Sequence, residues 1–70
     1  MTIETAEDYG QAIREAREAK GWSQNELARR LSVSPQSVYN WEKKGRLPRS
    51  IVRKALRRML GVRWLDDTKA

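Results

Sequence analysis

The sequence contains neither cysteine nor histidine. Without cysteine the chain cannot be cross-linked by disulfides, and without both residue types it lacks the usual ligands of a structural zinc site. The same absences remove the most common general acid/base and the most reactive nucleophile of enzymes. We therefore expect no metal, no cofactor and no enzymatic activity.

Long apolar runs are also missing. No stretch approaches the roughly 20 residues of a transmembrane helix, and the first ten residues are acidic and polar where a secretory signal is basic and then apolar. These features predict a cytoplasmic protein without a membrane partner. At 70 residues the chain can build one compact core, so we expect a single domain over residues 1–70, with no separate domain for a small-molecule ligand.

Lysine and arginine are concentrated in the middle of the chain. Residues 23–65 contain eleven of them against two acidic residues, whereas residues 1–22 contain five acidic and three basic residues. A basic surface on a small domain favours a polyanionic partner, because each neutralised phosphate releases counterions. Charge alone fits a merely solvated surface equally well, so the assignment depends on the residue pattern.

Helix signals divide the chain into an all-α fold, and no long segment alternates with the period of a strand. The first helix is expected from Thr5 or Ala6 to Lys20, with Gly21 in the left-handed position after it. Its apolar residues recur every three or four positions and form one stripe. They are Tyr9, Ala12, Ile13, Ala16 and Ala19.

Two short helices follow, joined by only three residues. Ser23 is expected to cap the first turn of one, with Glu26 reaching back in a capping box and Trp22 packing onto that turn; this helix ends near Leu31. Ser34 and Pro35 begin the next helix, which is expected over residues 35–44. Helices linked this tightly cross at a steep angle, so residues 23–44 predict a helix-turn-helix unit.

A last helix is expected to start at Pro48 or Ser50 and to end before Gly61. Its predicted apolar side consists of Ile51, Val52, Ala55, Leu56, Met59 and Leu60. The apolar cluster of Val62, Trp64 and Leu65 is expected to form one turn that folds back onto the core or meets a second subunit.

The third helix carries the candidate base-reading side chains. Val38 and Trp41 are three residues apart and face inward, whereas Gln36 and Asn40 are one turn apart on the outer side. A carboxamide presents a donor and an acceptor together, which matches the edge of adenine in the major groove. The candidate base contacts are Pro35, Gln36, Ser37, Tyr39 and Asn40. For Tyr39, packing against the last helix is an equally open alternative.

Candidate phosphate contacts flank this helix. Gln24 and Asn25 stand beside the free amides at the start of the second helix, where the helix dipole favours an anion. The full set is Gln24, Asn25, Ser34, Lys43, Lys44, Arg46 and Arg49. A further basic stripe of Arg53, Lys54, Arg57 and Arg58 either contacts DNA or solvates the outer face of the last helix.

The segment from Trp22 to Pro48, WSQNELARRLSVSPQSVYNWEKKGRLP, resembles the Cro and phage-repressor type of helix-turn-helix domain, also called the Xre-like family. The resemblance is carried by Ser23, Gln24, Leu27, Ala28, Leu31, Val33, Ser34, Ser37, Val38, Trp41 and Glu42. It implies a compact four- to five-helix bundle of the lambda-repressor-like type that binds double-stranded DNA, commonly as a homodimer across a two-fold site.

The resemblance also bears on single residues. By position, Gln24 matches the phosphate-binding glutamine of the family, and Pro35, Gln36, Ser37 and Asn40 match its base-contacting positions. The chain departs from the family at Ser32, where glycine is frequent, and at Pro35, where other members carry a base-reading side chain.

We therefore expect a sequence-specific transcriptional regulator, a Cro-like repressor of phage or prokaryotic type. Two alternatives stay open. The letters VYNWEKKGRLP also resemble excisionase-like or MerR-like DNA-binding proteins, which use a β wing, although the residues after Pro48 favour a helix. An antitoxin or antirepressor whose basic face meets an acidic protein would share the charge pattern but would show no base-sequence preference.

Overall fold

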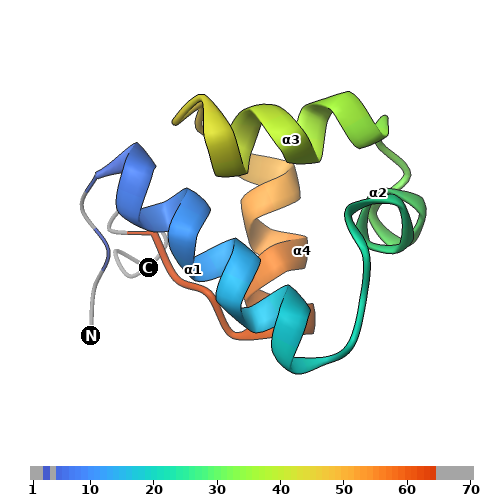
Figure 1. The fold of residues 1–70 in the computed structure, drawn as a ribbon. Helices are drawn as coiled ribbons and strands as arrows, with labels where there is room; N and C mark the ends of the chain where they lie inside the picture. Colours follow the sequence, from blue (N-terminus) through green and yellow to red (C-terminus); the bar gives the residue numbers. More distant parts are fainter. Residues whose placement is uncertain (1–2, 4, 65–70) are drawn as a thin grey trace.

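The computed structural model describes residue 3 and residues 5–64, which form four helices (Figure 1). They are α1 (Ala6–Ala19), α2 (Gln24–Leu31), α3 (Pro35–Lys43) and α4 (Ser50–Leu60). The predicted all-α fold class is confirmed, and the helix bounds agree with the expected ones to about a residue. Within the described part of the chain, no helix has the length and apolar character needed to cross a membrane.

Serine and threonine hydroxyls cap three of the helices. Thr5 Oγ1 accepts from the Asp8 amide at 3.1 Å, and Ser23 Oγ accepts from the Glu26 amide at 3.0 Å. Ser34 Oγ accepts from the Ser37 amide at 3.2 Å. These bonds satisfy donors that the first turn of a helix otherwise leaves free, so the predicted starts of α2 and α3 are confirmed.

The expected capping box at α2 forms only in half. The Glu26 carboxylate does not turn back to Ser23 but pairs with the guanidinium groups of Arg29 and Arg30, the latter at 2.8 Å. Two cations at the i+3 and i+4 positions attract a carboxylate more strongly than a neutral amide does. Trp22 is partly buried against the core, and the Arg30 guanidinium lies 4.2 Å from the centre of its ring; packing of Trp22 onto the first turn of α2 stays a prediction.

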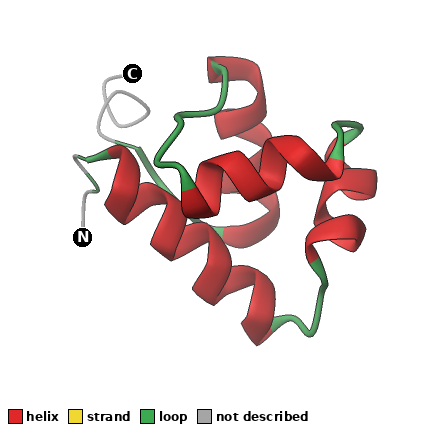
Figure 2. Ribbon diagram, turned by 45° about the horizontal axis from the view of Figure 1, so that its top comes forward, coloured by secondary structure: helices red, strands yellow, loops and turns green. Residues whose placement is uncertain are grey.

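The core is centred on α3, which packs against α1 and α2, while α4 packs against α1. Helix α3 runs across the bundle with α2 at its N-terminal end (Figure 2). Side chains from every helix contribute to the core. The buried apolar residues are Tyr9, Ile13, Leu27, Ala28, Val38, Trp41, Leu56 and Val62. The inward orientation predicted for Val38 and Trp41 is therefore confirmed, which leaves the opposite side of α3 exposed.

Helices α1 and α3 are in close backbone contact at Gly10. A Cβ atom at this position would overlap the backbone carbonyl oxygen of Trp41, so only glycine allows the contact. A residue larger than glycine at position 10 would therefore force α1 and α3 apart.

The link between α2 and α3 contains a left-handed serine. Ser32 has φ 58° and ψ 41°, the conformation that glycine adopts at little steric cost. The backbone at position 32 is therefore left-handed even though serine stands where glycine is frequent in the family. The next residue, Val33, is partly buried, and its amide donates to the Ala28 carbonyl at 2.9 Å.

Three expectations about apolar residues were wrong. Ala19 is exposed, because α1 extends past the helices that cover its earlier turns. Ile51, assigned to the apolar side of α4, is 74% exposed, because the first turn of α4 lies at the edge of the bundle. The chain at Val62 and Trp64 is extended rather than a helical turn, although it does fold back onto the core.

The extended segment of residues 62–64 packs against the start of the chain and α1. The ring of Trp64 meets that of Tyr9 edge-on, with centroids 5.6 Å apart and planes at 78°. An isolated parallel bridge pairs Trp64 with Ile3 and is the only strand-type pairing among the described residues. Leu65, which was expected to join this cluster, lies outside the described residues.

Candidate nucleic-acid interface

The outer face of α3 presents the two carboxamides that the sequence singled out. Gln36 Nε2 donates to Asn40 Oδ1 at 3.0 Å, so the two side chains lie together as their one-turn spacing predicted. The bond leaves Gln36 Oε1 as an acceptor and the Asn40 amide as a donor. Such a donor and acceptor side by side match a base edge in the major groove, and contact with a base stays a prediction.

The other side chains at the start and on the surface of α3 differ in their exposure to solvent and in their hydrogen bonds within the protein. The hydroxyl oxygens of Ser34 and Ser37 are 3.0 Å apart and bond to each other at the start of α3, so both are partly engaged within the protein. Pro35 is exposed and offers only its apolar ring. The Tyr39 side chain is 40% exposed, which keeps its ring accessible on the surface of α3.

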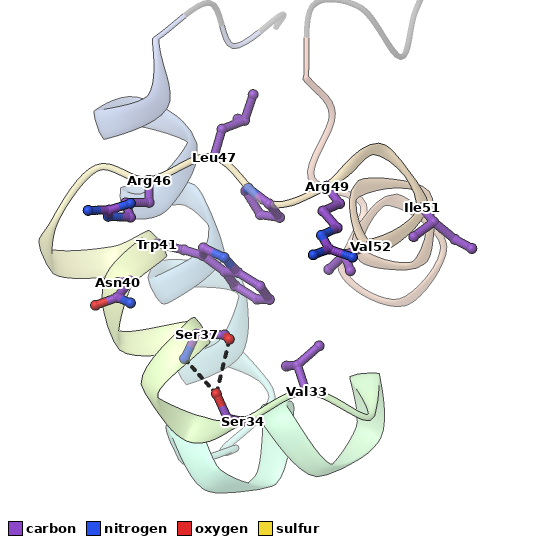
Figure 3. A pocket seen from close by; sticks show the side chains of 11 residues that line it. Val33, Ser34, Ser37, Asn40, Trp41, Arg46, Leu47, Arg49, Ile51 and Val52 are labelled. Carbon is purple, nitrogen blue, oxygen red and sulfur yellow. Dashed lines mark hydrogen bonds between the residues drawn. The ribbon is translucent and has the colours of Figure 1, made fainter.

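A groove of about 500 Å³ runs beside α3 and brings base-reading and phosphate candidates together (Figure 3). It is open to solvent and is bounded by the link between α2 and α3, by α3, by the loop of residues 44–49 and by the first turn of α4. Its lining residues are Val33, Ser34, Ser37, Asn40, Trp41, Arg46, Leu47, Pro48, Arg49, Ile51 and Val52. The groove therefore joins an apolar floor to a rim that carries two arginines.

Four cations between the last residue of α3 and the first residue before α4 are exposed as a phosphate contact requires. They are Lys43, Lys44, Arg46 and Arg49. Arg49 occupies the N-cap position of α4, where its side chain makes no capping bond, and the first turn of α4 contains no acidic residue. A cation at this end opposes the helix dipole, so its placement costs stability; contact of Arg49 with a phosphate stays a prediction.

The start of α2 places its two candidates differently. Asn25 is exposed and lines a depression of about 220 Å³ with Ser23, Glu26 and Arg29. Gln24 is half-buried, and its Nε2 donates to Glu42 Oε1 at 3.1 Å. The bond fixes the Gln24 carboxamide in one position at the N-terminus of α2, beside the free amides of the helix.

A buried ion pair stands behind this glutamine. Arg17 Nε and Nη2 donate to Glu42 Oε2 and Oε1 at 2.9 and 3.0 Å, and Arg17 Nη1 donates to the Trp22 carbonyl at 2.8 Å. The two side chains are 10% and 0% exposed. The hydrogen bonds to Glu42 raise the pKa of Arg17, so the guanidinium stays charged. The pair thus ties α1, the start of α2 and α3 into one unit.

Sequence reasoning missed this pair. Its members are 25 residues apart, and Arg17 was treated only as part of the charge balance. The available signal was its position, because Arg17 lies one turn after Ile13 on the apolar stripe of α1, where a charged residue needs a partner.

The basic stripe on α4 divides into two parts. Arg53 is half-buried, and its Nη1 donates to the Pro48 carbonyl at 2.7 Å, which ties the loop before α4 to the helix. Lys54, Arg57 and Arg58 are exposed on the outer side. Arg53 therefore stabilises the fold, whereas the side chains of Lys54, Arg57 and Arg58 are accessible to solvent or to a partner.

Comparison with known proteins agrees with this geometry. The helix-turn-helix family HTH_3 matches residues 13–66, which include α2, α3 and α4 entirely. Multiprotein-bridging factor 1 of Schizosaccharomyces pombe is 36% identical over 59 residues. The alignment covers 84% of this chain and 40% of that relative, so the chain spans less than half of the relative's length. The chain belongs to the HTH_3 family of Xre- and lambda-repressor-like helix-turn-helix domains, which bind DNA in transcription regulation.

Proposed function

We propose that the protein is a sequence-specific transcriptional regulator of the Cro-like repressor type that acts by binding alone, without catalysis. In this proposal α3 enters the major groove of double-stranded DNA, Gln36 and Asn40 read base edges, and two copies bind a two-fold operator in the cytoplasm. The observation that carries it is the Gln36–Asn40 pair, exposed on α3 beside a groove rimmed by Arg46 and Arg49.

The alternative of an excisionase-like reader receives little support. Its β wing would have to follow Pro48, where residues 50–60 form α4. Among the residues that the structure describes, the bridge between Ile3 and Trp64 offers no such wing.

A protein-interaction module remains a second candidate, because the relative from Schizosaccharomyces pombe is named a multiprotein-bridging factor. This candidate includes the antitoxin or antirepressor role. Both candidates predict binding that weakens with salt, so base-sequence preference is what separates them.

The test is selection of bound sequences from a random duplex pool near physiological salt. A palindrome with half-sites about one helical turn apart supports the dimeric repressor. An unpaired motif argues against the dimer, and no enrichment argues against sequence-specific DNA binding altogether.

The same selection with two variants tests the roles of single residues. Gln36→Ala is expected to relax base preference at one position in each half-site. Lys43→Ala is the matched control on the same helix, and it is expected to weaken binding to all sequences about equally. Equal effects of the two variants on base preference would contradict the assignment.

A further inference from the structure

The buried pair of Arg17 and Glu42 is charged for a reason that the stability of the fold does not supply. The two side chains are 10% and 0% exposed, and both carboxylate oxygens of Glu42 accept from the Arg17 guanidinium. Taking two charges out of water is costly, and apolar side chains of similar size often stabilise a fold at least as well. The pair is therefore expected to do something that apolar side chains cannot do.

Glu42 binds a third group besides the guanidinium. Its Oε1 accepts from Nε2 of Gln24 at 3.1 Å. A carboxylate only accepts hydrogen bonds, so it selects the nitrogen of the Gln24 carboxamide and excludes the orientation in which the amide oxygen faces Glu42. The nitrogen carries two hydrogens, and the bond to Glu42 uses one of them. The second N–H is therefore held in place as a donor.

Arg17 makes this arrangement compatible with an anion on the other side of Gln24. An unpaired carboxylate behind the glutamine would repel a phosphate, and the guanidinium neutralises it. Arg17 Nη1 also donates to the Trp22 carbonyl at 2.8 Å, one residue before the Ser23 cap of α2. Arg17 therefore fixes both the carboxylate that holds Gln24 and the chain that leads into α2.

Gln24 is half-buried at the first position of α2, where free backbone amides and the helix dipole favour an anion. A donor that is already held in place loses less conformational entropy on binding than a glutamine that rotates freely. We infer that Arg17 and Glu42 are positioning residues for DNA binding, which hold the Gln24 amide nitrogen ready to donate to a phosphate. This inference rests on the proposed function, because it requires α2 to contact the DNA backbone.

The double variant Arg17→Met, Glu42→Leu separates positioning from stability. It leaves the net charge unchanged and fills the space with apolar groups, so the protein should remain folded. Its affinity for a duplex with one selected half-site should fall roughly fivefold, because the released Gln24 carboxamide keeps only part of its contact. The slope of affinity against salt should not change, since no cation contact is lost. A folded double variant with the affinity of the wild type would overturn the inference.

Gln24→Ala tests whether the effect of the pair passes through Gln24. Alone, this variant should lower affinity roughly tenfold, the scale of one hydrogen bond to a charged group. Combined with the double variant, it should give the loss of Gln24→Ala alone, within about twofold. Losses that multiply would show that the pair acts on another contact. Glu18→Gln, from the exposed pair with Arg14, is the matched control on α1 and should stay within about twofold of the wild type.

Glu42→Asp gives a second test that does not depend on folding of the double variant. It keeps a negative charge for Arg17 but moves the carboxylate back by one methylene group, out of hydrogen-bond reach of Gln24. Half-site affinity should again fall roughly fivefold. Affinity equal to that of the wild type would contradict the role of Glu42 in holding Gln24.

Nuclear magnetic resonance of the free protein tests the positioning without DNA. The side-chain amide of Gln24 should have the heteronuclear Overhauser effect of a rigid group in the wild type and that of a mobile group in the double variant. The exposed Gln11 of α1 is the internal control and should not differ between the two proteins. A mobile Gln24 in the wild type overturns the inference alone. A wild type that binds no duplex overturns the proposed function and the inference with it.

Discussion

Ser32 ends α2 in a conformation in which a side chain crowds the following carbonyl group. It is the only residue other than glycine with a positive φ in the described part of the chain. The short link to α3 imposes this conformation, since three residues must turn the chain sharply. The steric strain at Ser32 therefore lies in the turn that orients α3, the proposed recognition helix.

Replacing Ser32 with glycine should raise the free energy of unfolding by about 0.5–1 kcal/mol, because relief of the strain exceeds the entropy that glycine adds to the unfolded chain. A thermal melt measures the change. Ser34→Gly is the control two residues away, and there the same substitution removes a cap and should lower stability by about a few tenths of a kcal/mol. A lower stability for Ser32→Gly would contradict strain in this turn.

The pair of Arg17 and Glu42 is the other residue-scale feature with a large energetic consequence. Glu42→Gln leaves the Arg17 charge buried without its counter-charge and should lower the free energy of unfolding by about 3 kcal/mol in urea titrations. Since the pKa of Arg17 is raised, its contribution is present throughout the neutral range and is lost only in strong alkali.

Two variants control this prediction. Glu18→Gln removes a carboxylate from an exposed pair with Arg14 and should cost less than about 0.5 kcal/mol. The double variant Arg17→Met, Glu42→Leu replaces the pair with apolar groups and should recover most of the loss. A double variant as unstable as Glu42→Gln would show that the loss does not arise from the unpaired charge.

At the scale of elements, α4 begins with a cation where a capping side chain would stabilise it. Arg49→Ser supplies a capping hydroxyl and removes the unfavourable charge, so it should raise the free energy of unfolding by about 1 kcal/mol. The same change should lower affinity for duplex DNA roughly five- to tenfold near 0.1 M salt, through one lost phosphate contact. A melt and a titration with duplex measure the two effects.

The matched control is Lys54→Ser on the exposed side of α4, one turn further on. It removes a cation without providing a cap, so its stability should change by less than about 0.5 kcal/mol. If Arg49→Ser gains stability and loses no affinity, Arg49 does not meet the phosphates.

The helices themselves were predictable because their signals are local. Ser23 and Ser34 each accept a hydrogen bond from the amide three residues later, and Gly61 ends α4 in the left-handed region. These boundaries are therefore defined by residues that are close together in the sequence. Periodicity also identified the inward side of α3, and hence the outer placement of Gln36 and Asn40.

Features that depend on what covers a residue were not predictable. The period of α4 assigns Ile51 to its apolar side but does not reveal that no neighbouring helix reaches the first turn. The engagement of Gln24 with Glu42 joins residues 18 positions apart on different helices. Both depend on the packing of helices in space, which a single sequence encodes only indirectly.

For the whole molecule, the basic residues are concentrated in the middle of the chain, behind an acidic beginning. If Lys43, Lys44, Arg46 and Arg49 each neutralise a phosphate, the logarithm of half-site affinity should fall against the logarithm of salt with a slope of about −3 to −4. Affinity then drops on the order of a hundredfold between about 50 and 200 mM salt.

Variants at single cations test this assignment. Lys43→Ala should bring the slope closer to zero by about one. Arg14→Ala removes one cation from α1, which carries none of the proposed phosphate contacts, and should leave the slope unchanged. Equal slopes for both variants would show that the protein responds to its net charge rather than to defined contacts.

The bridge between Ile3 and Trp64 has a consequence for how the fold can be combined with others. It makes the entry and exit of the described chain neighbours, separated by about the spacing of paired strands. A unit with adjoining ends can be inserted as a cassette into a surface loop of a host protein, because the host chain has almost no gap to span. For the same reason the fold is suited to circular permutation, in which a short linker joins the two ends and the chain is opened in the loop before α4.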